Sequence, residues 1–226
     1  MEITEDNKKE FEIHGAFSQE TISTKYDELA RNYEDVYTAV GWPDPEKTAE
    51  KVIEHGFSDD TFIIDFGCGT GLVAHHLNTK SPETTLNIIG VDASDKMLDQ
   101  AREKKHYTEL KNRLLCNPEE FKTELPDFLG RFDYVTASGL LAEGHATNHI
   151  FTEMDMVLKK GGYAIFTSRE EYLTSLGYQE GMDEMVSSGK WEKISQTTYE
   201  KYSNAPKSSV GRFKPTISAV HVYRKI

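Results

Sequence analysis

The chain has 226 residues, with 26 Lys and Arg against 38 Asp and Glu, which gives a formal net charge of −12. The length suits a single domain, and the acidic balance argues against broad nucleic-acid binding, which needs a dense face of Lys and Arg. Two cysteines exclude a disulfide framework and a CxxC zinc site, and no stretch approaches the ~20 apolar residues of a membrane span. We therefore expect a cytoplasmic protein that holds no metal ion and does not bind membranes.

The charge is distributed unevenly along the chain. Residues 1–150 hold 15 basic and 29 acidic residues, whereas residues 191–226 hold 7 basic and 2 acidic residues. Within the second region, residues 203–214 form a predicted loop with three cations: Lys207, Arg212 and Lys214. Such a loop is either solvated or in contact with an acidic substrate or partner.

The N-terminal region precedes the first predicted strand. Residues 1–20 are polar and predict a flexible arm or lid. Residues 22–40 carry apolar side chains at steps of three and four, which predicts one helix ending at Gly41. A second helix is expected to begin near Pro45, with Asp44 as its cap, and to end at Gly56.

Short apolar runs alternate with helical segments from Thr61 onward. The predicted strands are 61–65, 86–92, 113–117, 132–138 and 163–168, and the predicted helices between them are 71–79, 94–106 and 146–159. Consecutive apolar positions favour strands that are covered on both faces, and parallel strands need helical crossovers. The pattern predicts a doubly wound, Rossmann-like α/β sheet.

The last third of the chain completes this sheet. The third of those predicted helices is expected to end in Lys159, Lys160 and two glycines, with the two cations complementing its dipole. A helix over 172–188 follows, and 191–202 and 216–225 read as a closing antiparallel pair. We expect seven strands, mostly parallel with a C-terminal antiparallel strand, with helices on both faces, in one domain over 21–226.

The most informative segment is a glycine-rich loop over 65–72, which directly follows the first strand and opens a helix. Glycines allow a close backbone approach to a ligand, and the helix start offers unpaired N–H groups. Asp92 ends the second strand, where a carboxylate can accept hydrogen bonds from both hydroxyls of a ribose. The segment therefore predicts a site for a nucleoside.

Asp65 argues against a dinucleotide at this loop. The pattern is Asp-x-Gly-x-Gly-Thr-Gly rather than GxGxxG, and a carboxylate beside the loop repels phosphate but helps to position an ammonium group. A nucleoside joined to an amino acid therefore fits better than NAD.

Four motifs resemble the class I S-adenosylmethionine-dependent methyltransferases. They are IIDFGCGTG, GVDASDKML, FDYVTASGLL and LKKGGYAIF, and they occur in the family's order. The YDELARNYED, SGLLAEG and LKKGGYAIFTSRE stretches are also similar to the methyltransferase-like subgroup of the Williams-Beuren syndrome region. The resemblance implies S-adenosylmethionine as cofactor.

The resemblance also implies the cofactor contacts. The loop residues Gly67, Cys68, Gly69, Thr70 and Gly71, with Asp65, would hold the methionine part and the ribose, and Asp92 would bind the ribose hydroxyls. Adenine would lie against Ala93, Ser94, Met97 and Asn117; Asn117 stands where the family usually has Asp. Ser138 and Gly139 would lie near the sulfonium, and Tyr26 or Tyr33 would close over the amino-acid end.

No catalytic dyad stands out, because methyl transfer mainly requires alignment of the nucleophile, the methyl group and sulfur. His145 and His149 follow the fourth strand and are weak catalytic candidates. Further candidates at the rim of the site are Glu143, Arg169, Glu170 and Tyr172. We expect a methyltransferase acting on an O or N nucleophile of a small molecule. The alternatives are protein methylation and a non-catalytic S-adenosylmethionine-binding subunit, and the oligomeric state is not indicated.

Overall fold

The computed structural model describes residues 18, 20–205 and 213–226. Residues 1–17 and 19 of the predicted N-terminal arm lie outside the described residues, as do residues 206–212 of the basic loop, which include Lys207 and Arg212. Among the described helices, none has the length and apolar character needed to cross a membrane.

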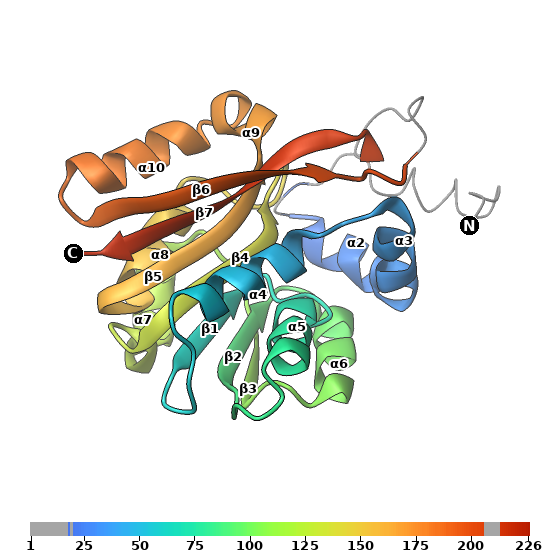
Figure 1. Cartoon of the computed structure of the whole chain (residues 1–226), viewed down its shortest axis with the longest axis horizontal. Helices are drawn as coiled ribbons and strands as arrows, with labels where there is room; N and C mark the ends of the chain where they lie inside the picture. Colours follow the sequence, from blue (N-terminus) through green and yellow to red (C-terminus); the bar gives the residue numbers. More distant parts are fainter. Residues whose placement is uncertain (1–17, 19, 206–212) are drawn as a thin grey trace.

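A seven-stranded sheet forms the centre of the molecule (Figure 1). Its strands are β1 (Phe62–Phe66), β2 (Asn87–Asp92), β3 (Glu109–Asn112), β4 (Phe132–Leu141), β5 (Leu158–Arg169), β6 (Trp191–Lys201) and β7 (Thr216–Lys225). The order across the sheet is β3-β2-β1-β4-β5-β7-β6, and β7 runs antiparallel to both of its neighbours. The predicted fold class, including the closing antiparallel pair, is confirmed.

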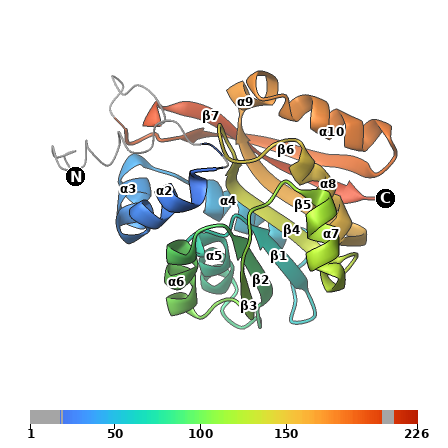
Figure 2. The ribbon, with the colours of Figure 1, turned by 180° about the vertical axis from the view of Figure 1, so that it is seen from behind.

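Helices cover both faces of the sheet (Figure 2). They are α2 (Ile22–Leu29), η1 (Ala30–Asn32), α3 (Tyr33–Val40), α4 (Asp44–Glu54), α5 (Leu72–Lys80), α6 (Asp95–Lys104), α7 (Pro118–Glu124), η2 (Pro126–Phe128), α8 (His149–Val157), α9 (Glu170–Ser175) and α10 (Tyr178–Ser187). Neighbouring residues of β1 show the two faces, since Ile63 packs with α4 and α5 whereas Ile64 packs with α7, α8 and α10. Both residues are fully buried, as the continuous apolar run of this strand predicts.

The third strand was predicted four residues too late, at 113–117. β3 instead comprises Glu109–Asn112, at the edge of the sheet, and pairs with β2 alone. An edge strand needs no apolar run, which explains why the polar sequence ELKN gave no signal. The apolar residues that follow it leave the sheet and line the cavity described below.

Three helix predictions need correction. The single helix over 22–40 is two helices joined by the η1 turn, although it does end before Gly41. The helix over 146–159 is α8, which ends at Val157 with no cation in its last turn, and Lys159 forms an ion pair with Asp133. The helix over 172–188 is divided into α9 and α10 at Gly177, whose φ of +72° is the left-handed conformation that favours glycine.

Asp44 does not cap α4 as predicted. Pro43 occupies the cap position, and Asp44 is the first helical residue and is completely buried. Its Oδ2 lies 2.6 Å from Lys201 Nζ and accepts a hydrogen bond from Thr167 Oγ1 at 3.1 Å. A long-range ion pair therefore replaces the local cap.

Candidate cofactor and acceptor site

A cavity of about 660 Å³, its open mouth included, lies at the carboxyl ends of β1 to β4. The predicted site residues on its wall are Tyr26, Tyr33, Gly67, Gly69, Asp92, Ala93, Ser94, Met97, Ser138, Gly139 and His145. The structure therefore brings residues from five separate parts of the chain to one place.

Asp92 joins two sides of this cavity. Its Oδ2 accepts a hydrogen bond from the Gly69 backbone N–H at 2.8 Å, and its Oδ1 accepts one from the Ser94 N–H at 2.9 Å. Burial raises the pKa of this carboxyl, and the backbone donors oppose that rise. A carboxylate has about four acceptor positions, so it retains capacity for the hydroxyls of a ligand.

Helix α2 forms the wall opposite the glycine loop and is fastened to the start of α6. Ser23 Oγ donates to the Ala93 carbonyl at 2.8 Å. Asp27 Oδ1 accepts from Ser94 Oγ at 2.6 Å and from the Lys96 N–H at 3.1 Å. A carboxylate at this position also complements the positive end of the α6 dipole.

Tyr26 and His145 meet inside the cavity. Tyr26 Oη lies 2.7 Å from His145 Nε2, and His145 Nδ1 lies 2.7 Å from the Glu143 carbonyl oxygen. His145 is buried, whereas the other candidate, His149, is exposed at the first turn of α8 and does not line the cavity. Of the two histidine candidates, the structure therefore brings only His145 to the site.

Ser138 and Gly139 lie in the distorted end of β4. Gly139 has a φ of +72°, and a Cβ atom there would lie 2.9 Å from the Trp42 ring, so only glycine fits. Its N–H donates to Thr167 Oγ1 at 2.9 Å, which is itself bonded to Asp44. The buried pair of Asp44 and Lys201 is thus connected to the cavity wall through one threonine.

A smaller recess of about 280 Å³ adjoins the cavity, with Tyr33, Gly67, Gly69 and Ser138 on both walls. The loop residues Cys68 and Thr70 also line it, together with Trp42. Trp42 Nε1, Thr70 Oγ1 and Ser138 Oγ are buried and have no hydrogen-bond partner. Buried polar atoms are rarely left unpaired, and all three of these residues line the same recess.

Two predicted residues point elsewhere. Asp65 is completely buried and accepts from Tyr107 Oη and Thr136 Oγ1, each at 2.7 Å, and it lines neither the cavity nor the recess. Its contact with an ammonium group stays a prediction, since both carboxyl oxygens are bonded within the protein. Gly71, the last glycine of the loop, packs against Tyr107 instead of lining the cavity.

Burial raises the pKa of the Asp65 carboxyl to about 6. The folded protein therefore holds this proton more tightly than the unfolded chain, and the associated stability is present below about pH 4 and is lost as pH rises through about 6. We expect Asp65→Asn to remove about 3 kcal/mol of pH dependence between pH 4 and 7. Urea unfolding of both proteins across this range measures it, and parallel curves would contradict the assignment.

Asn117 does not reach the cavity either, since it caps α7 and bonds to Glu120. The preceding residue, Cys116, lines the cavity with a positive φ of 78°. The buried Glu153 carboxylate accepts from the backbone N–H groups of Cys116 and Asn117 at 2.8 and 2.7 Å. Glu153 thus fixes the shape of this wall, and backbone atoms take the place expected for the Asn117 side chain.

The remaining rim candidates are dispersed. Glu143 contributes its carbonyl to His145, and Glu170 is exposed. Arg169 is buried over the rings of Tyr172 and Tyr202 and forms an ion pair with Glu171. None of these side chains lines the cavity or the recess.

Sequence reasoning missed part of the wall. The unpredicted residues that line the cavity are Ile22, Ser23, Arg113, Leu114, Leu115, Cys116 and Leu140. From the sequence, an apolar side chain that lines a cavity cannot be distinguished from one that packs in the core. Within the ranges that the structure describes, no group of three or more His, Cys, Asp or Glu side chains is arranged to hold a metal ion.

Comparisons with known proteins find similar sequences. The model of a family described as "Methyltransferase domain" matches residues 57–205. Human methyltransferase-like protein 27 is 30% identical over 175 residues, which are 75% of this chain and 67% of that protein.

Solved structures share the fold. Magnesium protoporphyrin IX methyltransferase from Synechocystis, with bound S-adenosylmethionine, matches with a TM-score of 0.54 and 14% identity, covering 80% of this chain and 79% of that one. A structure of the Haloferax volcanii Trm112 methyltransferase activator in complex with a methyltransferase matches with a TM-score of 0.62 and 15% identity, over 90% and 96% of the two chains.

Proposed function

Because the chain belongs to the S-adenosylmethionine-dependent methyltransferases, we propose that it methylates an oxygen or nitrogen nucleophile of a small molecule. The observation that carries this proposal is the enclosure of the cavity by α2, whose Ser23 and Asp27 are hydrogen-bonded to the start of α6. A wider depression of about 790 Å³, its open mouth included, adjoins the cavity at His145 and is lined by Ser18, Glu20 and 144–147. A small acceptor fits this arrangement better than a folded protein.

The cavity residues fit the adenosyl part of the cofactor. Asp92 would accept hydrogen bonds from the ribose hydroxyls, and the backbone of Gly67 and Gly69 would lie against the ribose and methionine parts. Met97 and Leu115 would lie against adenine. When bound, the cofactor supplies an electrophilic methyl group on a positively charged sulfur.

The recess fits the amino-acid end of the cofactor. Its three unpartnered atoms include the Trp42 indole N–H, which can only donate, and two hydroxyls, on Thr70 and Ser138. A carboxylate would satisfy all three. This assignment replaces the expected role of Asp65 and adds Trp42, which no sequence motif indicated.

We expect Trp42→Phe to weaken S-adenosylhomocysteine binding about 10-fold, because a hydrogen bond to a charged group contributes about 1.5–3 kcal/mol. Binding of 5′-methylthioadenosine, which lacks the amino-acid end, should change less than about twofold. Titration calorimetry with both ligands makes the comparison. Equal losses for both ligands would mean that Trp42 acts only by packing.

Labelled methyl transfer tests the proposed function. Wild-type protein and S-adenosylmethionine labelled in the methyl group are incubated with a metabolite extract and, separately, with a protein extract. We expect label in the metabolite extract. Label only in protein would favour protein methylation, and cofactor binding without transfer to either extract would favour a non-catalytic subunit.

A further inference from the structure

The hydrogen bonds of His145 define its tautomer. The Glu143 carbonyl can only accept, so His145 Nδ1, 2.7 Å away, carries the proton. In the neutral ring, Nε2 is then the acceptor, and Tyr26 Oη donates to it at 2.7 Å. The pair is therefore arranged to pass a proton from the phenol to the imidazole.

The location of the pair suits a proton acceptor for the reaction. Tyr26 and His145 line the cavity together with Gly69, Ser138 and Gly139. His145 also forms part of the wall of the outer depression, which includes Glu20. A molecule in the depression thus borders the same imidazole that borders the cofactor cavity.

We propose that Tyr26 and His145 act together as the general base and that the acceptor is a small molecule with a neutral hydroxyl group, an inference that rests on the proposed function. The acceptor O–H gives its proton to Tyr26 Oη as the Tyr26 proton moves to His145 Nε2. The new O–CH₃ bond forms while the S–CH₃ bond breaks, and both electrons of that bond remain on sulfur. The proton then leaves from the imidazolium to solvent.

The chemistry of the nucleophile supports this choice. A hydroxyl becomes strongly acidic as it is alkylated and needs a positioned base. A neutral amine attacks through its free electron pair and can lose its proton to water afterwards, and a carboxylate has no proton to lose. Glu20 lines the same depression as His145, while Glu143 faces His145 through its carbonyl.

NMR of the S-adenosylhomocysteine complex tests the pair without any acceptor. Nitrogen-15 spectra at pH 7.5 should show a neutral His145 with the proton on Nδ1. Tyr26→Phe removes the bond to Nε2 and should shift the Nε2 resonance of His145, whereas His75→Gln, at an exposed histidine, should leave it unchanged. An imidazolium, or a proton on Nε2, at pH 7.5 would overturn the proposal.

Turnover tests the substrate class. Phenol, benzyl alcohol and benzylamine serve as matched probes, beside the metabolite fraction that accepts label. We expect transfer to the hydroxyl compounds, and Tyr26→Phe and His145→Gln should each lower kcat by about 100-fold or more with little change in KM for S-adenosylmethionine.

Transfer to benzylamine alone, or variants within about threefold of the wild-type kcat, would overturn the inference. A different outcome contradicts the proposed function itself: label that enters protein but no small molecule. In that case the NMR result still decides whether Tyr26 and His145 can serve as a base. Urea unfolding transitions like that of the wild type show that the variants are folded.

Discussion

Replacing Asp92 with alanine should weaken S-adenosylhomocysteine binding by about 10- to 100-fold or more. Hydrogen bonds to a charged group contribute about 1.5–3 kcal/mol, and 1.4 kcal/mol corresponds to a factor of ten in affinity. Asp92 also holds the Gly69 and Ser94 N–H groups, so its removal disturbs the glycine loop as well. Titration calorimetry measures the loss.

Two further variants separate these contributions. Asp92→Asn keeps the shape of the side chain and removes its charge, so we expect an intermediate loss. Asp99→Asn, on the exposed side of α6 where it pairs with Arg102, should bind like wild type. Wild-type affinity in Asp92→Ala would show that the β2 carboxylate does not contact the cofactor.

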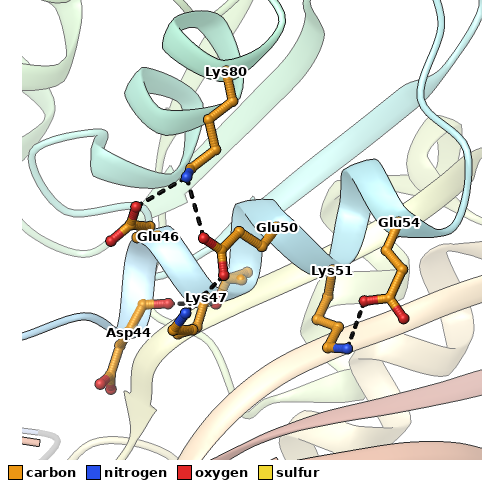
Figure 3. A network of polar contacts seen from close by, with 8 residues as sticks. Asp44, Glu46, Lys47, Glu50, Lys51, Glu54 and Lys80 are labelled. Atoms are coloured by element: carbon orange, nitrogen blue, oxygen red, sulfur yellow. Dashed lines mark hydrogen bonds and ion pairs between the residues drawn. The ribbon is translucent and has the colours of Figure 1, made fainter. Parts of the chain in front are cut away.

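Lys201→Met should lower the free energy of unfolding by about 3–5 kcal/mol, because it leaves the Asp44 carboxylate buried and without its cation. The two side chains are 7% and 1% exposed, and their charged atoms lie 2.6 Å apart. Figure 3 shows Asp44 at the start of α4, beside the ion pairs of that helix. Urea unfolding measures the change.

Lys47 provides a matched control on the same helix. It pairs with Glu50 at 2.8 Å (Figure 3), but both side chains are more than a third exposed. Such surface pairs contribute about 0–1 kcal/mol, so Lys47→Met should be nearly neutral. In the double variant Asp44→Leu with Lys201→Met, we expect a smaller loss than the sum of the two single losses, since no charge remains buried. Additive losses would mean that the two charges do not interact.

The central strands could be predicted because burial on both faces requires consecutive apolar residues. Ile63 and Ile64 are such a case. β3 has no such apolar run, since an edge strand can be polar. The strand was therefore predicted at the apolar RLLCN segment that follows it. Asp44 looked like a cap because its partner Lys201 lies 157 residues away, beyond any local pattern.

The site residues likewise divide into those that could be predicted from the sequence and those that could not. Motifs indicated the glycine loop, Asp92, Ser138 and Gly139, because backbone geometry and a fixed charge restrict the residue type. Asp65 was predicted from its charge and Asn117 from a motif, and neither side chain lines the cavity, since Asp65 bonds to Tyr107 and Asn117 to Glu120. Trp42 could not be found, because only the fold brings its indole N–H to the recess.

The fastening of α2 to the start of α6 links cofactor affinity to local folding. Ser23 and Asp27 hold a wall contributed from about 70 residues earlier in the chain, and without that wall the cavity loses one side. The apparent dissociation constant equals the intrinsic constant divided by the fraction of molecules with α2 in place. A state with α2 in place only a tenth of the time would thus bind the cofactor about tenfold more weakly, with every contact in the cavity unchanged.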